Sequence, residues 1–317
     1  MKFLEYKKSD ITDKTLKKDV RQVTTIIFVY FIVFQFAALV SSLVLSSMRK
    51  ESKAAVNDFL SNSGLPYLVA IGLGLFVIFV SMTPSIRKQT FAVSTRKMTG
   101  GIFLALVAVV MTGQVILSVY GSLFEHLVNL IGYTSTEQLK EATGTSKTFS
   151  MLLYAGFLGP VTEEIVFRGF LLRNLEKYGQ GFAIIISAYM FGLYHSNFLQ
   201  TPFAFVVGLI LGYVALTYGI KWSILLHIFN NFVLGDTLNY FLQNFNDRQA
   251  DIVSSTLIWT GGVIGMVILW FYKGAIRKWY RSNKPTGKEL KLAFTGKSLI
   301  LITIIIFIIS CLGLDKI

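Results

Sequence analysis

The chain has 317 residues, of which 53% are hydrophobic and only 15% are charged, and its mean hydropathy is +0.60. Soluble domains carry about 25% charged residues, so the composition excludes an ordinary soluble protein and predicts an integral membrane protein. The net charge of +13 does not indicate nucleic-acid binding, because Lys and Arg cluster at 2–21, 87–97 and 273–297, each beside a long apolar run. The single cysteine, Cys311, excludes an intrachain disulfide.

Apolar segments long enough to cross a bilayer, about 20 residues each, recur along the chain. They predict an all-α polytopic membrane protein, a bundle of eight or nine transmembrane helices with an intramembrane cavity. The count is eight if the last segment, which is short and borders Asp315, does not span. The first is longer than the about 7–15 apolar residues of a signal peptide, so it should remain as a span. The segments are 23–47, 66–82, 98–121, 150–172, 182–198, 202–218, 222–243, 254–272 and 298–314.

Loop charge predicts the orientation of these spans. The N-terminal tail holds seven Lys and Arg residues and 273–297 holds eight, so both segments are expected in the cytoplasm. The loop 122–149 holds only two and should face outward. The stretch 273–297 is predicted to be either an interfacial helix, with Ile276, Trp279 and Tyr280 on one face, or a solvated charged loop.

Ionisable side chains within three of the predicted spans indicate a functional site, because charges in a membrane are expensive and usually face a partner or a cavity. In the stretch EEIVFRG, Glu164 and Arg168 are four residues apart and can form an ion pair on one helix face. Glu163 lies about 140° from Arg168 around the helix and is left without this partner. His195 ends the fifth segment.

The seventh segment contributes His227 and Asn231, which share a helix face at i and i+4. A carboxylate can accept a proton from water, an imidazole can orient that water, and an amide can donate to an oxyanion. Each group also has a structural reading: an ion pair, a locally satisfied histidine, or an asparagine joining two helices. Their occurrence together on three helices favours a hydrolytic site.

In order along the chain, the motifs E-E-x-x-x-R, F-x-x-x-H and H-x-x-x-N resemble those of the CAAX-protease and bacteriocin-processing family, also called the Abi family. The resemblance covers about residues 150–240 and divides the chain into three expected parts. These are membrane helices with an outer loop at 1–149, a catalytic helix block at 150–243, and C-terminal membrane helices with a basic cytoplasmic loop at 244–317.

The resemblance implies an intramembrane endopeptidase that hydrolyses a peptide bond of a membrane-associated peptide or protein. Glu163 would activate water with help from His195, while His227 and Asn231 would stabilise the oxyanion. Glu164 and Arg168 would support these four residues. A bacterial plasma-membrane location, roles in peptide processing or bacteriocin immunity, and an envelope protein partner are further expectations.

The family is often described as metalloproteases, and Glu163, His195 and His227 could form a zinc site with two histidines and one glutamate. The chain lacks the H-E-x-x-H motif that places two ligands on one helix. A glutamate acting directly as base needs no metal, so hydrolysis without a required cofactor is the favoured expectation.

Two other classes of function fit the same residues. One is a non-catalytic membrane scaffold that regulates an envelope enzyme or sensor kinase. The other is a proton-coupled transporter, which the absence of repeat symmetry in the sequence disfavours.

Helix rise raises a geometric difficulty for any of these functions. At about 1.5 Å per residue, Glu163, His195 and His227 lie about 15, 21 and 9 Å from the inner ends of their segments. Straight, upright helices would keep them apart, so tilt, a short helix or a re-entrant start is expected.

Overall fold

The computed structural model describes residues 12–143 and 146–317 and is almost entirely helical. The two strands in this part of the chain have two residues each, so the predicted all-α class is confirmed. The elements before the site are α1 (Asp13–Ser47), α2 (Lys53–Asn62), α3 (Leu65–Ser81), α4 (Pro84–Thr90), α5 (Gly100–Asn129), β1 (Tyr133–Thr134) and α6 (Thr136–Thr143).

The remaining helices include two long runs in which α-helix alternates with π-helical turns. The first run holds α7 (Phe149–Leu152), η2 (Leu153–Leu158), α8 (Gly159–Glu163), η3 (Glu164–Leu172) and α9 (Arg173–Leu175), followed by the 3-10 turn η4 (Glu176–Tyr178). The second holds α12 (Ile220–Ile228), η5 (Phe229–Thr237) and α13 (Leu238–Leu242). The others are α10 (Gln180–Tyr194), α11 (Gln200–Thr217), α14 (Asp247–Asn283), α15 (Gly287–Phe294), α16 (Lys297–Leu312) and β2 (Asp315–Lys316).

All nine predicted segments coincide with a helix or with one of the two runs, and the number that cross the membrane remains a prediction. In the described residues four helices qualify by length and composition, α1, α5, α11 and α14, and six if the bent pairs α2–α3 and α15–α16 each count as one. The π turns divide the two runs into short pieces, and α10 has 15 residues where about 20 are needed. Two helices extend beyond their predicted apolar segments, because α1 begins at Asp13 and α14 continues to Asn283.

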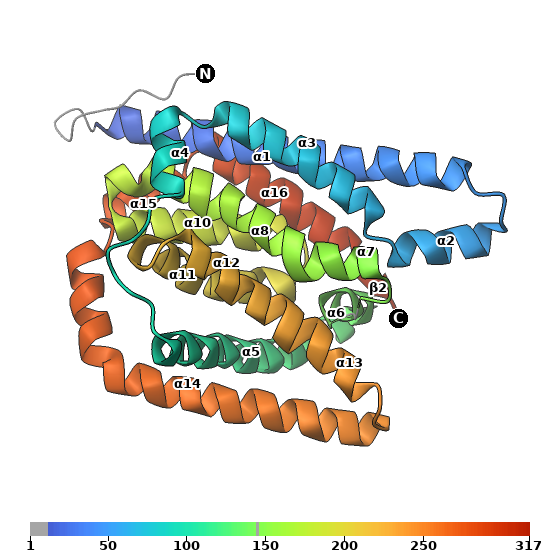
Figure 1. The fold of residues 1–317 in the computed structure, drawn as a ribbon. Helices are drawn as coiled ribbons and strands as arrows, with labels where there is room; N and C mark the ends of the chain where they lie inside the picture. The colour runs from blue at the N-terminus through green and yellow to red at the C-terminus, as the bar shows by residue number, and fades with distance from the viewer. Residues whose placement is uncertain (1–11, 144–145) are drawn as a thin grey trace.

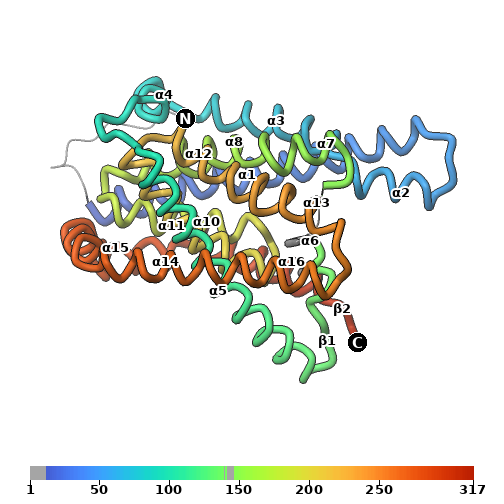
Figure 2. Tube along the Cα trace, turned by 60° about the horizontal axis from the view of Figure 1, so that its bottom comes forward, coloured from blue at the N-terminus to red at the C-terminus, as the bar shows by residue number. Residues whose placement is uncertain are grey.

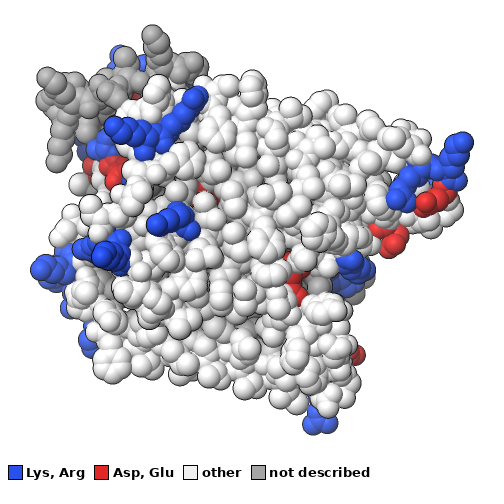
Figure 3. Space-filling view, in the orientation of Figure 1, with Lys and Arg blue, Asp and Glu red and all other residues white. Residues whose placement is uncertain are grey.

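The helices lie in a flat stack with the two runs in the middle. Figures 1 and 2 show α3 beside α1 on one side and α14 beside α5 on the other, with α8, α10, α11 and α12 between them. The most completely buried side chains come from the first run and α10, and include Phe167, Phe170 and Phe182. Charge is scarce across the broad surface in Figure 3, and most Lys and Arg side chains lie toward its edges.

The segments predicted to share a membrane side do lie together. Lys288 Nζ is 2.8 Å from Asp13 Oδ2, which joins the basic stretch 273–297 to the start of α1. At the other end of the molecule, β1 from the predicted outer loop pairs antiparallel with β2 near the C-terminus. These contacts place the basic stretch beside the start of α1 and the loop 122–149 beside β2. The membrane side of each segment remains a prediction.

Three glycines allow α14 to approach α5 closely. A Cβ at Gly265 would collide with the Ala108 carbonyl oxygen and the Thr112 hydroxyl of α5, and one at Gly262 would collide with Val115. Thr112 Oγ1 also donates to the Gly262 carbonyl at 2.9 Å. Small residues that let helix backbones approach are a common means of helix association in membranes.

We expect Gly265→Leu to destabilise the protein, because the added side chain must separate α14 from α5. Overpacking of this kind costs about 1–3 kcal/mol. Thermal unfolding of the detergent-solubilised protein measures the effect. Gly274→Leu is the matched control, since a Cβ at Gly274 of the same helix meets nothing within 4 Å. Equal melting temperatures for both variants would contradict this packing.

Candidate active site

The glutamate pair lies where the first run changes from α-helix to π-helix. Glu163 is the last residue of α8, and η3 begins at Glu164. His227 occupies the end of α12, and Asn231 lies in η5 directly after it. π-helical turns occur often at functional sites, because they change the angle at which side chains leave the helix.

Glu164 is buried and accepts hydrogen bonds from three side chains. Arg168 Nη1 lies 2.7 Å from Glu164 Oε1, so the predicted ion pair is confirmed, with both side chains 0% exposed. His227 Nδ1 is 3.0 Å from the same oxygen, and the Ser223 hydroxyl donates to Glu164 Oε2. Buried charges are tolerated when they are paired and hydrogen-bonded in this way.

Glu163 has a different environment. Its side chain is 17% exposed, and its Oε2 lies 3.6 Å from His227 Nε2, outside normal hydrogen-bond distance. Glu163 also lies within electrostatic range of Tyr154 and Tyr194. The two adjacent acids are therefore held in different ways: Glu164 by three donors, Glu163 facing one imidazole.

His195 is oriented by the helix that carries it. Its Nδ1 lies 2.9 Å from the Phe191 carbonyl oxygen. Because a carbonyl oxygen can only accept, Nδ1 carries the hydrogen in this contact, and Nε2 is available for another partner. The Phe191 ring lies edge-on to both histidines, with centroids 5.0 Å from His195 and 5.6 Å from His227. The Arg168 guanidinium lies 4.2 Å from the centroid of the same ring. Phe191 thus packs against three polar members of the site.

The turn after His195 is fixed by a residue from the loop predicted to face outward. Gln138 of α6 accepts the Phe198 amide hydrogen at 3.1 Å and donates to the Ser310 carbonyl of α16 at 2.8 Å. Asn197 donates to the Gln138 carbonyl at 3.1 Å. The position of His195 therefore depends on contacts from α6 and α16, far away in the sequence.

Asn231 joins the two helical runs. Its Nδ2 donates to the Ala155 carbonyl of η2 at 3.3 Å, and its Oδ1 accepts from Asn230 at 3.0 Å. Asn230 in turn accepts from Gln114 of α5 at 3.4 Å. The Asn231 amide has a second hydrogen available for another acceptor.

Of the six predicted site residues, the structure brings Glu163, Glu164, Arg168 and His227 into one contact network. His195 joins through Phe191, and Asn231 lies one turn beyond His227. Glu163 and His227 therefore come together despite their different distances from the inner ends of their predicted segments. Sequence reasoning missed Ser223, although it lies four residues before His227 and so on the same helix face.

The expected zinc ligands do not converge in this structure. Among the described residues, no group of three His, Cys, Asp or Glu side chains has an arrangement that could hold a metal ion. His227 faces both glutamates, but its Nδ1 is taken by Glu164, and His195 contacts the Phe191 ring between them. A set made of Glu163, His195 and His227 does not fit a metal here.

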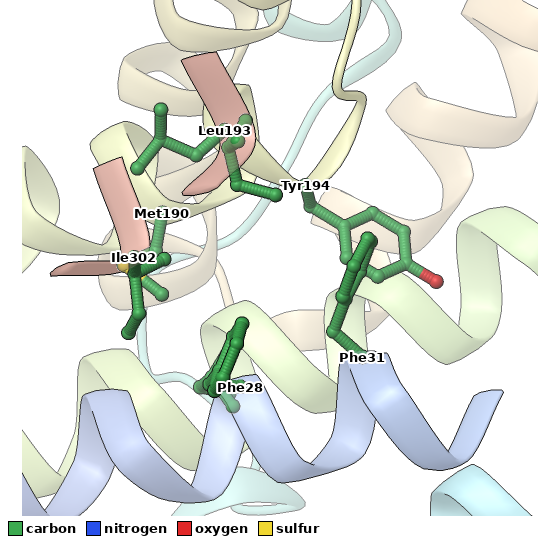
Figure 4. Close-up of a pocket in the computed structure, with 8 residues that line it drawn as sticks. Phe28, Phe31, Met190, Leu193, Tyr194 and Ile302 are labelled. Carbon is green, nitrogen blue, oxygen red and sulfur yellow. The ribbon is translucent and has the colours of Figure 1, made fainter. Parts of the chain in front are cut away.

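An apolar pocket beside the site, next to Tyr194, is too small for a substrate. Figure 4 shows Tyr194 next to Phe31 of α1, on the edge of an apolar crevice that also touches α16. Its volume is about 20 Å³, comparable to the space needed for one water molecule. Tyr194 is fixed there by Tyr30, whose hydroxyl lies 3.3 Å from the Tyr194 hydroxyl.

The fold and the site define a polytopic helical membrane protein with a buried carboxylate–imidazole centre. The family model of the type II CAAX prenyl endopeptidase Rce1-like proteins matches residues 145–233 of this chain, and these residues contain every predicted site residue. The resemblance to the CAAX-protease family is therefore confirmed over this part of the chain. No curated protein and no solved structure matches the chain.

The two glutamates are expected to differ when neutralised. Glu164→Gln leaves the Arg168 guanidinium buried without its counter-charge, and breaking a buried pair in this way costs about 3–5 kcal/mol. Glu163→Gln removes a charge that has no direct ion pair with a Lys or Arg, so folding should be retained. Thermal unfolding and membrane abundance measure both effects.

The double variant Glu164→Gln, Arg168→Met is the control for this assignment, because it removes both charges together. It should recover part of the stability that Glu164→Gln loses. An unstable Glu163→Gln beside a stable Glu164→Gln would reverse the roles of the two residues.

Proposed function

We propose that this protein is an intramembrane endopeptidase in which Glu163 activates the water that cleaves a peptide bond. The observation that carries the proposal is the contrast between the two acids. Glu164 is saturated by Arg168, His227 and Ser223, whereas Glu163 faces His227 at 3.6 Å and is partly exposed. A carboxylate that is not occupied by strong donors has oxygen atoms available to a water molecule. The substrate is a peptide or protein associated with the bilayer.

In the proposed reaction, Glu163 takes a proton from water, and the resulting hydroxide attacks the carbonyl carbon of the scissile bond. His195 orients the water through Nε2, which its contact with the Phe191 carbonyl leaves open. The carbon–nitrogen bond then breaks, and Glu163 returns the proton to the leaving amine. The products are a carboxylic acid and an amine, and the site returns to its starting state.

The position of His227 supports its role in stabilising the developing oxyanion. Its Nδ1 lies 3.0 Å from Glu164 Oε1 and its Nε2 lies 3.6 Å from Glu163 Oε2, so the ring lies between the two carboxylates. In the proposed role, Nε2 donates to the substrate oxygen on which negative charge develops.

Asn231 is the second proposed oxyanion donor. One amide hydrogen is used by the Ala155 carbonyl at 3.3 Å, and the other is available to a substrate oxygen. Removing one such donor lowers kcat by about 10²–10³ in a well-studied protease. A stabilising hydrogen bond that forms only in the transition state would raise kcat with little effect on substrate binding.

We expect Glu163→Gln to abolish peptide release while leaving the protein folded, since an amide cannot accept the proton of water. The measurement is quantitative mass spectrometry of peptides released by cells that express either form. Glu176→Gln is the matched control, because Glu176 pairs with Arg173 at the far end of the same run. That variant should release the same peptides as the wild type.

A genetic experiment distinguishes catalysis from scaffolding. In a deletion strain, Glu163→Ala should fail to restore the phenotype that the wild-type chain restores. Full complementation by Glu163→Ala would remove the basis for a peptidase and favour a non-catalytic regulator of an envelope protein.

The proposed reaction requires no metal, because Glu163 acts on water directly. Purified active protein is expected to keep its activity after dialysis against a strong zinc chelator. Loss of activity on chelation, with recovery on adding stoichiometric zinc, would overturn this part of the proposal.

A further inference from the structure

A cavity of about 420 Å³ lies between the outer parts of the two helical runs that carry the site. This volume falls within the about 300–1,000 Å³ typical of ligand pockets. In Figure 1 its walls, α7 and α13, lie at the end of the molecule that also holds α6 and the C-terminus. The lining residues are Ser146, Lys147, Thr148, Phe149, Leu152, Phe232, Asp236, Thr237 and Tyr240.

Asp236 is the acidic residue of this cavity and is only 9% exposed. Its Oδ1 accepts the Ser146 amide hydrogen at 2.9 Å, and no ion pair involves Asp236 among the described residues. The other charged lining residue, Lys147, is exposed and can extend into solvent. A buried carboxylate bound by a single amide retains the capacity to accept hydrogen bonds from a ligand.

Part of the remaining lining is apolar or aromatic. Leu152, Phe232 and Tyr240 line the space beside Asp236. Lysine and arginine side chains have an apolar stem, which can pack against these residues, and a charged head, which can bind a polar partner such as Asp236. The chemistry of the lining therefore favours a basic side chain.

The cavity is aligned with the site along both runs. Asp236 follows His227 by nine residues and Leu152 precedes Glu163 by eleven, which corresponds to about 13 and 16 Å of helix. An extended peptide covers about 3.3 Å per residue, so four or five residues reach from one place to the other. Between them lies the hydrogen bond from Asn231 to the Ala155 carbonyl.

We propose that this cavity is a substrate subsite that binds a lysine or arginine of the peptide, four or five residues from the scissile bond, through Asp236. The inference rests on the proposed peptidase function and adds to it a class of substrate. It also places the approach of the substrate at the end of the bundle that carries α6 and β2.

Cysteine labelling tests the electrostatics of the cavity without requiring activity. Thr237→Cys is made in a Cys311→Ser background, because Cys311 is the single native cysteine and is exposed. The full-length protein in lipid nanodiscs is then labelled with the cationic aminoethyl or the anionic sulfonatoethyl methanethiosulfonate. Adding Asp236→Asn should lower the ratio of cationic to anionic labelling rates by about fivefold, the effect of one nearby charge in a wet environment.

Asn244→Cys is the matched control, since Asn244 is exposed and does not line the cavity. Its labelling ratio should not respond to Asp236→Asn. If Asp236→Asn also leaves the ratio of labelling rates at Thr237→Cys unchanged, the proposal is overturned, because Asp236 would then have no influence on what enters the cavity.

Cleavage of a peptide library tests the role in substrate choice. The library contains quenched fluorescent decapeptides in which lysine, leucine or glutamate is fixed at each position in turn. The wild type should prefer lysine four or five residues from the cut. Asp236→Asn should raise KM for these peptides about tenfold or more with little change in kcat, whereas Asp251→Asn, an exposed residue of α14, should not.

Filling the cavity provides an independent variant. Leu152→Trp should block cleavage of the lysine peptides, while Leu158→Trp, which alters an exposed residue of the same run, should not. Cleavage without any preference at these positions would overturn the subsite and leave the peptidase intact. No cleavage by the wild type, with labelling that still depends on Asp236, would instead mean that the cavity binds a cation or a lipid and that the proposed function fails.

Discussion

The Glu164 carboxylate is the point at which the two helical runs of the site are joined. It holds Arg168 within its own run, and it reaches across to Ser223 and His227 of the other. If one member of a buried network of this kind is removed, the remaining members keep a charge or a donor that has no partner. The network therefore acts as a unit. The position of His227, and hence its distance from Glu163, follows from this one anchor.

The anchor explains why two neighbouring acids can differ in chemistry. Consecutive residues leave a helix about 100° apart, so Glu163 and Glu164 cannot both face Arg168. The buried acid is neutralised by its donors, and the other remains beside an imidazole at the edge of the buried region. If both acids lay on one helix face, their surroundings would be similar, and the two roles proposed for them could not be separated.

Much of the site could be predicted from the sequence because its contacts are local. The Glu164–Arg168 ion pair needs only helical spacing, and the confirmed all-α class needs only long apolar runs. Contacts between distant segments could not be predicted this way. Gln138, which fixes the turn after His195, lies in a loop whose sequence shows only polarity. Hydropathy also does not reveal where π-helical turns interrupt an α-helix.

The π turns also explain why Asp236 escapes a sequence reading. Ser223, His227 and Asn231 follow one another at intervals of four and share a face of an ordinary α-helix. Five residues further on, an α-helix would turn Asp236 about 140° away from that face. In η5 the hydrogen bonds run from i to i+5, so residues five apart return toward the same side, and Asp236 lies against Gly156 of η2. A change in helix type thus extends one polar face from the buried anchor, past the residues proposed to be catalytic, to the cavity.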